Sequence, residues 1–182
     1  MSLKVIVLII CIGVVIWFVT IGRVQITEEN VRALYEQSEA AFERADGKAY
    51  CDLFSDDMSG KFTSRAPSAP ISNTTDTINK RFVCASVARF YSSQEEMARK
   101  AGRLINVKRS YETKSISISP DKKSATAEVQ TDIRWVADIG EIMILKIHQN
   151  DQIEIKSGKI KFSKREAVGT YSAGEAGNPA YR

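Results

Sequence analysis

The chain has few of the residues that build metal and redox centres. Its 182 residues include one histidine and three cysteines. A metal site needs several histidine, cysteine or carboxylate ligands at a usable spacing, and the sequence holds no CxxC, HxxH or HExxH pattern. Glycine patterns that cradle phosphates are also missing. We therefore predict no metal and no cofactor. We expect the single histidine, His148, to lie on a strand and face solvent; the alternative is a catalytic pair with Cys51 or Cys84.

The composition excludes several classes of protein. Hydrophobic residues make up 43% of the chain and charged residues 26%, with 10 glycines and 4 prolines. These values exclude collagen, a low-complexity polymer and a wholly disordered chain. Three cysteines are too few for a small scaffold built on disulfides. The length predicts one domain, or one domain plus an appendage, and the net charge of +4 indicates no partner by itself.

An uncharged run lies close to the N-terminus. After a short flank, residues 1–4, residues 5–22 (VIVLIICIGVVIWFVTIG) carry no charge. A bilayer core of about 30 Å needs roughly 20 apolar residues in a helix. A cleavable signal peptide has a shorter apolar core and a small-residue cleavage site, and the flank IGRVQ offers no such site. We predict that residues 5–22 form an uncleaved transmembrane signal anchor.

Charges beside this run predict its orientation. The N-terminal side carries the α-amino group and Lys4, whereas Arg23 on the far side is followed by Glu28 and Glu29. Positive charge near a helix end favours the cytoplasmic side. We therefore expect a single-pass protein of a bacterial inner membrane, with its C-terminal domain in the periplasm or outside. A protein partner or a homo-oligomer is expected there, and nucleic acid is not.

Two cysteines in the domain could form one disulfide. Cys51 lies one turn before Phe54 on an expected helix, and Cys84 lies beside Val83 on another. Outside the cytoplasm a bridge is permitted, and it requires Cα atoms about 4.4–6.8 Å apart. The alternative is a pair of buried free thiols.

Helical patterns dominate the first half of the domain. Apolar residues at helical spacing predict a helix from about Thr27 to Ala45, and a second short helix carries Tyr50, Leu53, Phe54 and Met58. Residues 59–77 are expected to be irregular, with a short strand at 61–63 as the only regular element. A long helix is expected over 77–101, interrupted at Ser92 and Ser93 because Ser93 and Glu96 form a capping-box pattern.

From Leu104 onward the period changes to two. Apolar residues alternate with polar ones over 125–135, and residues 142–145 look buried on both faces. The sequence KSGK at 156–159 predicts a hairpin, and residues 172–182 show no apolar pattern and are expected to be disordered. Helices followed by strands predict an α+β domain over 23–171, with helices packed on a strongly curved antiparallel sheet.

This layout resembles the nuclear-transport-factor-2-like superfamily, which has a cone-shaped α+β fold. The opening EENVRALYEQSEAAFERADGKAYCDLFSDDM looks like its first two helices, and the closing QIEIKSGKIKFSKREAVGTY is similar to its last two strands. The long loop at 64–77 departs from the short hairpin that the superfamily often has there. An anchor followed by such a domain also looks like the periplasmic assembly factor of type IV secretion systems. The resemblance implies a fold and does not select a function.

The resemblance also implies where a site would lie. Enzymes of this fold use a carboxylate and tyrosines inside the cone, so the candidates for a ligand pocket are Tyr35, Tyr50, Tyr111 and Trp135, with ordinary aromatic core as the alternative. No acidic residue stands out as buried. A basic cluster of Arg99, Lys100, Arg103, Lys108 and Arg109 either meets phosphate head groups or an acidic partner, or forms a solvated face.

We therefore expect a membrane-anchored, non-enzymatic domain that binds a partner protein or a small apolar ligand, in envelope or secretion-system assembly. The alternative is an isomerase or cyclase with its active site inside the cone. A buried carboxylate facing tyrosines in a deep pocket favours the enzyme, and a cone filled by its own aromatic residues favours the binding module.

Overall fold

The structure is a computed structural model that describes residues 24–66, 73–102 and 104–174. The expected anchor at 5–22, its flank at 1–4 and Arg103 of the basic cluster lie outside these residues. Within the described residues, no helix has the length and apolar character needed to cross a membrane.

Three helices begin at side-chain caps. Helix α2 (Glu28–Glu43) starts where the Thr27 hydroxyl accepts from the Asn30 amide, and α3 (Gly47–Asp52) starts at Asp46. Helix α4 (Lys80–Ala101) starts at Asn79, whose side chain accepts from the Phe82 amide, and ends at Gly102 in the left-handed conformation. Such caps satisfy backbone groups that the first and last turns leave unpaired.

The predicted interruption of the long helix at Ser92 and Ser93 is wrong. Helix α4 runs through both residues without a break. Their hydroxyls donate to the carbonyls of Arg89 and Phe90 one turn earlier, at 3.1 and 2.8 Å. Because each hydroxyl bonds back to its own helix, it caps no new one.

Six strands form one sheet in the order β2-β1-β6-β5-β4-β3. Their bounds are Phe54–Arg65 (β1), Thr74–Asn79 (β2), Asn106–Ile118 (β3), Ser124–Ala137 (β4), Gly140–Lys156 (β5) and Lys159–Ala173 (β6). The predicted meander of four long strands is confirmed as β3–β6, and the alternation over 125–135 is confirmed as the inward and outward faces of β4. Strand β6 extends to Ala173, two residues into the tail predicted to begin at 172.

The sheet is mixed, whereas an antiparallel sheet was predicted. Strands β1 and β6 pair in parallel, and every other neighbouring pair is antiparallel. The predicted helix through Phe54 and Met58 is wrong after Asp52, because both residues lie on β1, where they are buried. The pairing of β1 with β6 has an irregularity between Phe54 and Ser59. The short strand predicted at 61–63 is confirmed as part of β1. The irregular structure predicted for the rest of 59–77 is wrong at both ends, which belong to the β1–β2 hairpin, and residues 67–72 lie outside the described residues. A Cβ at Gly60 would lie 1.9 Å from the Arg165 carbonyl oxygen, so only glycine permits this approach of β1 to β6.

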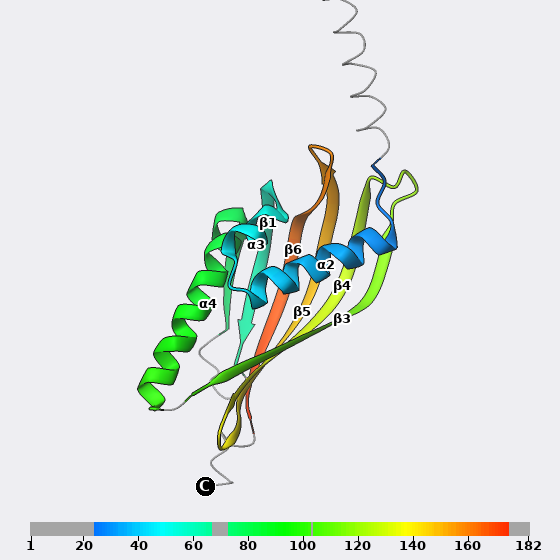
Figure 1. The fold of residues 1–182 in the computed structure, drawn as a ribbon. Coiled ribbons are helices and arrows are strands. Elements are labelled where there is room, and N and C mark those ends of the chain that lie inside the picture. The colour runs from blue at the N-terminus through cyan, green and yellow to red at the C-terminus, as the bar shows by residue number, and fades with distance from the viewer. Residues whose placement is uncertain (1–23, 67–72, 103, 175–182) are drawn as a thin grey trace, which may run out of the picture.

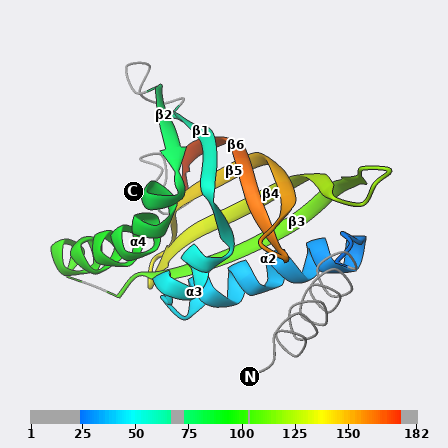
Figure 2. The ribbon, with the colours of Figure 1, turned by 90° about the horizontal axis from the view of Figure 1, so that it is seen from above.

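The long strands curve around the helices. Figure 1 shows α2 crossing in front of β3–β6 while α4 stands beside β1 and β2, and Figure 2 shows the same arrangement from above. The inward faces of the strands and the apolar stripes of the helices meet in a main core, which holds Ile26, Phe54, Val87, Ile153 and Phe162. A smaller cluster forms around Ile133, Trp135 and Leu145. The predicted α+β class and the strong curvature of the sheet are confirmed.

Candidate functional site

A cavity of about 280 Å³ lies between the helices and the concave face of the sheet. Helix α4 lines it with Phe82, Val83, Ser86 and Phe90, which share one helical face. Strand β5 contributes Leu145, Ile147 and Gln149, which alternate along the strand and therefore point to the same side. Most of the lining is apolar, and polar groups enter it at Arg109, Thr131, Gln149 and Arg165. We call this the central cavity.

A largely buried ion pair lies at the edge of the central cavity. Asp151 on β5 has no exposed side-chain surface, and Arg165 on β6 is 12% exposed. Arg165 Nε donates to Asp151 Oδ1 at 2.7 Å, and Arg165 Nη2 donates to Oδ2 at 2.8 Å. Burial disfavours the charged guanidinium, but the Asp151 carboxylate outweighs this effect and raises the pKa of Arg165. Arg165 therefore remains charged within this pair.

Two neutral groups complete the contacts of Asp151. The Tyr35 hydroxyl on α2 donates to Oδ2 at 2.6 Å, and Gln149 Nε2 donates to the same oxygen at 2.9 Å. Burial, and then the negative charge of Asp151, raise the pKa of the Tyr35 hydroxyl. Tyr35 thus keeps its proton and acts as a donor. Both carboxylate oxygens of Asp151 already accept hydrogen bonds from protein groups.

No acidic residue was predicted to be buried, and the buried Asp151 corrects that prediction. The residue lies in the segment QNDQIEIK, where polar residues surround it. The signal that could have found it is the period of two: Leu145, Ile147, Gln149, Asp151 and Ile153 follow one another at every second position, and all face inward. An alternation that continued through Gln149 would have placed Asp151 in the core.

A second buried ion pair joins α2 to β3. Glu39 Oε2 lies 3.0 Å from Arg109 Nη1, with the side chains 15% and 16% exposed. The Arg109 guanidinium carbon lies 4.3 Å from the centre of the Phe42 ring, a cation–π contact. Burial raises the pKa of the Glu39 carboxyl, and the Arg109 charge opposes this shift only in part.

This second pair means that the predicted basic cluster does not gather on one surface. Arg109 faces the interior, whereas Lys108 beside it is exposed on the other side of β3. Arg99 and Lys100 lie in the last turn of α4, where Lys100 pairs with Glu96 at 2.7 Å.

The four aromatic pocket candidates lie in different surroundings. Tyr50 lines the central cavity. Tyr35 packs in the core against Phe162 and against Tyr111, with ring centres 5.1 and 6.1 Å apart. Both tyrosines line a minor void of about 10 Å³. Trp135 is 6% exposed and packs against Phe90 in a separate cluster. Of the four, Tyr50 alone is among the described residues that line the central cavity.

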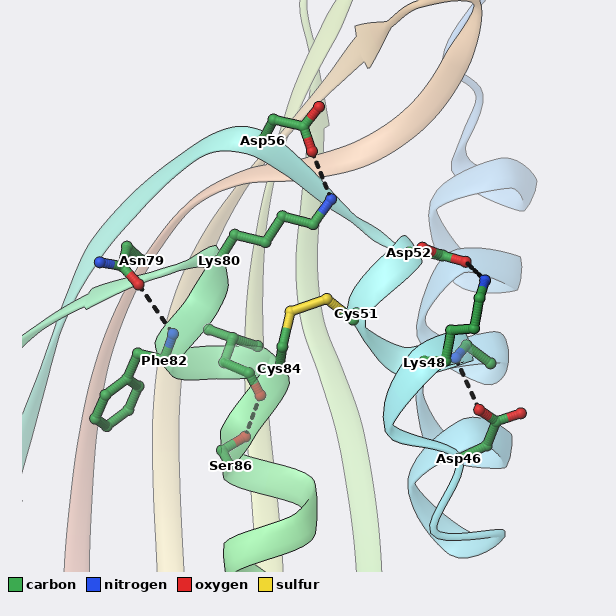
Figure 3. The surroundings of a disulfide bond; sticks show 12 residues. Asp46, Lys48, Cys51, Asp52, Asp56, Asn79, Lys80, Phe82, Cys84 and Ser86 are labelled. Atoms are coloured by element: carbon green, nitrogen blue, oxygen red, sulfur yellow. Dashed lines mark hydrogen bonds and ion pairs between the residues drawn. A yellow bond between two sulfur atoms is a disulfide. The ribbon is translucent and has the colours of Figure 1, made fainter.

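Cys51 and Cys84 form a disulfide that joins α3 to α4 (Figure 3). Their Cα atoms are 4.7 Å apart, within the range that the prediction required. The bridge lies beside the central cavity, because the preceding residues, Tyr50 and Val83, both line it. His148 is exposed on β5, far along the chain from this bridge.

The sequence matches no model of a known protein family and no curated protein. Its structure is similar to that of a conserved protein from Planctomyces limnophilus, with 14% identity, 80% of this chain and 97% of the other covered, and a TM-score of 0.54. It is also similar to a protein from Catenulispora acidiphila, with 13% identity, 78% of this chain and 89% of the other covered, and a TM-score of 0.51. An NTF2-like protein of unknown function from Shewanella baltica has 10% identity, 78% of this chain and 91% of the other covered, and a TM-score of 0.50. These likenesses show the fold, and the expected cone-shaped NTF2-like architecture is confirmed.

Proposed function

We propose that this domain binds a small apolar ligand in the central cavity and does not transform it. The observation that carries the proposal is the cavity itself, about 280 Å³ in volume, with apolar side chains from both helices and strands on its walls. Pockets of this kind gain affinity from removing apolar surface from water, and a few polar groups orient the ligand. Arg109, Thr131 and Gln149 are the polar groups in position to do so.

The contacts of Asp151 favour binding over catalysis. An isomerase or cyclase of this fold needs a carboxylate that is free to exchange a proton with a substrate inside the cone. Asp151 faces Tyr35, as such an enzyme would require, but Arg165 covers both of its oxygens. Arg165 and Gln149 are among the described residues that line the central cavity, whereas Asp151 is not.

The proposal places the domain on the outer side of a membrane, anchored by residues 5–22. The charge-free run and the charges around it support this location. The Cys51–Cys84 disulfide supports it independently, since disulfides persist in oxidising compartments and are rare in the cytosol. A ligand-binding domain there would serve the cell envelope, including the assembly of an envelope complex.

Two serines on α4 give a matched test. Ser86 lines the central cavity and Ser92 is exposed, and each hydroxyl donates to the carbonyl three residues earlier. The neutral fluorescent probe N-phenyl-1-naphthylamine should bind the wild type saturably with one site per chain. Ser86→Leu fills part of the cavity and should weaken binding by about tenfold or more, whereas Ser92→Leu should leave it unchanged. Equal affinities in the two variants would contradict the proposal.

A further inference from the structure

One end of the domain holds the first described residues of the chain. Residues 24–27 lie there with the β3–β4 turn (119–123) and the β5–β6 turn (156–159) (Figure 1). The β4–β5 turn (138–139) and the last turn of α4 lie at the opposite end. We call the end with residues 24–27 and the two turns the basal end.

Backbone hydrogen bonds tie the segments of the basal end together. The Ile26 amide donates to the carbonyl of Lys122 at 2.8 Å, and the Ile155 amide donates to that of Lys123 at 3.3 Å. Ile26 is also fully buried in the main core. Because the fold holds these first residues in place, they cannot serve as a flexible linker to the segment that precedes them.

Four lysines at the basal end are available to an outside partner. Lys122, Lys123 and Lys159 are exposed. Lys159 and Lys161 line a surface groove together with Val24. None of the four lysines forms an ion pair with a described residue.

Most acidic side chains near the basal end already have cationic partners. These acids are Glu28, Asp52, Asp56, Asp57 and Glu154, and their partners are Arg32, Lys48, Lys80 and Lys156. Asp121 accepts hydrogen bonds within its own turn, and Glu29, exposed in the groove, opposes the lysines in part. The free lysines thus exceed the acids that lack a cationic partner, and their long side chains can reach beyond those acids.

The basal end is separated from the predicted anchor by one residue. The uncharged run ends at Gly22, and Arg23 alone stands between it and Val24. A chain spans at most about 3.6 Å per residue, so Val24 lies within about 7 Å of the end of the run. The head-group layer on each side of a bilayer core is about 5–8 Å thick. An anchor at 5–22 therefore brings the basal end to the level of the lipid head groups.

We propose that the basal end lies on the bilayer surface, where Lys122, Lys123, Lys159 and Lys161 contact the phosphates of anionic phospholipids. The inference rests on the anchor under Proposed function and not on the ligand of the central cavity. Lysines beside a membrane are attracted by anionic lipids, and the attraction falls off within about 10 Å at physiological salt. The connection through Arg23 keeps these lysines within that range.

The test measures how fast an acetylating reagent modifies each lysine of the full chain held in lipid nanodiscs. One set of discs contains phosphatidylcholine alone, and the other contains equal parts of phosphatidylcholine and phosphatidylglycerol. We expect the four basal lysines to react about fivefold more slowly in the discs with phosphatidylglycerol. Lys108 and Lys146, which are exposed outside the basal end, should react equally in both. Equal rates for the basal lysines in the two kinds of disc would overturn the proposal.

A pair of double variants controls for net charge. Lys122→Glu/Lys159→Glu should remove the protection of the two remaining basal lysines. Lys108→Glu/Lys146→Glu changes the net charge by the same amount and should leave the protection intact. Both should keep the circular dichroism spectrum of the wild type, because all four positions are exposed. Protection that survives the basal substitutions, or that is lost equally in both variants, would contradict the assignment.

The possible failures can be told apart. A chain that does not enter the discs refutes the anchor itself, whereas a chain that enters with unprotected lysines refutes the lipid contact alone. Protection by inorganic phosphate in discs of phosphatidylcholine assigns the lysines to a free anion and overturns the membrane surface as their partner. None of these results concerns the central cavity, which the titration with N-phenyl-1-naphthylamine tests separately.

Discussion

Asp151 and Arg165 occupy directly opposite positions on the neighbouring strands β5 and β6. The carboxylate is fully buried, and the guanidinium reaches both of its oxygens at 2.7 and 2.8 Å. The guanidinium carbon also lies 5.2 and 5.0 Å from the ring centres of Phe54 and Phe162. One cross-strand pair thus carries two charges into the aromatic core and fixes the register of the last two strands.

Breaking this pair should be costly because the remaining partner stays charged and buried. We expect Asp151→Leu alone, or Arg165→Met alone, to lower the free energy of unfolding by about 3–5 kcal/mol. The double variant should cost clearly less than the sum of the two, since it leaves no unpaired charge. Urea unfolding of the four proteins measures this coupling, and simple additivity would show that the two charges do not depend on each other.

Tyr35 should make stability depend on alkaline pH. Burial raises the pKa of its hydroxyl in the folded protein above the ordinary value of about 10. Above that pH the unfolded chain releases this proton and the folded chain keeps it, so this one group lowers the free energy of unfolding by about 1.4 kcal/mol for each further pH unit.

Tyr35→Phe removes both the hydrogen bond to Asp151 and this titration. At neutral pH the variant should be less stable by about 1.5–3 kcal/mol. Its stability should then converge on that of the wild type as the pH rises above 10. Unfolding curves at a series of pH values from 7 to 11 check this, and a constant difference between the two proteins would rule out the raised pKa.

The disulfide should stabilise the wall of the central cavity. Cys51 and Cys84 are 33 residues apart, and closing a loop of this length stabilises the fold by about 3–4 kcal/mol in the chain-entropy account. A reductant should therefore lower the unfolding free energy of the wild type by that amount. The Cys51→Ala/Cys84→Ala variant should already be less stable and should not respond to the reductant; a response of similar size in that variant would assign the effect to something else.

The proposed location can be tested with fusions to the C-terminus. Alkaline phosphatase, which is active only outside the cytoplasm, should be active when joined to the full chain, and a cytoplasmic reporter at the same point should be silent. The protein recovered from membranes should retain residues 1–23. The reverse reporter pattern, or a mature chain that begins near Val24, would refute the signal anchor.

Strong local periodicity made some elements predictable from sequence. Helix α2 has a clear cap at Thr27 and an apolar stripe. Along β4, buried residues alternate with more exposed ones over the whole strand. The class of fold followed from the order of such elements. Of strand β1 only residues 61–63 were predicted, because its sequence, FSDDMSGKFTSR, has no regular alternation and pairs with β6 only through contacts distant in the chain.

The polar site was less predictable for a related reason. The burial of Asp151 depends on its hydrogen bonds with Arg165, Tyr35 and Gln149. These three residues come from three elements and meet only in the folded state. Arg109 likewise looked like one of several surface charges, because its partner Glu39 lies on a different element, 70 positions earlier in the printed sequence. Spacing along the chain carries no information about such pairs.

The most direct test of the account is to locate an apolar ligand by methyl NMR. During titration with N-phenyl-1-naphthylamine, the methyl signals of Val83, Leu145 and Ile147, which line the central cavity, should shift together and saturate. The methyl signals of Val129 and Ile153, which are buried in the core but are not among the described residues lining that cavity, should stay in place. Shifts confined to surface residues, or no saturable shift in the cavity methyls, would contradict the proposal that the cone is a ligand-binding site.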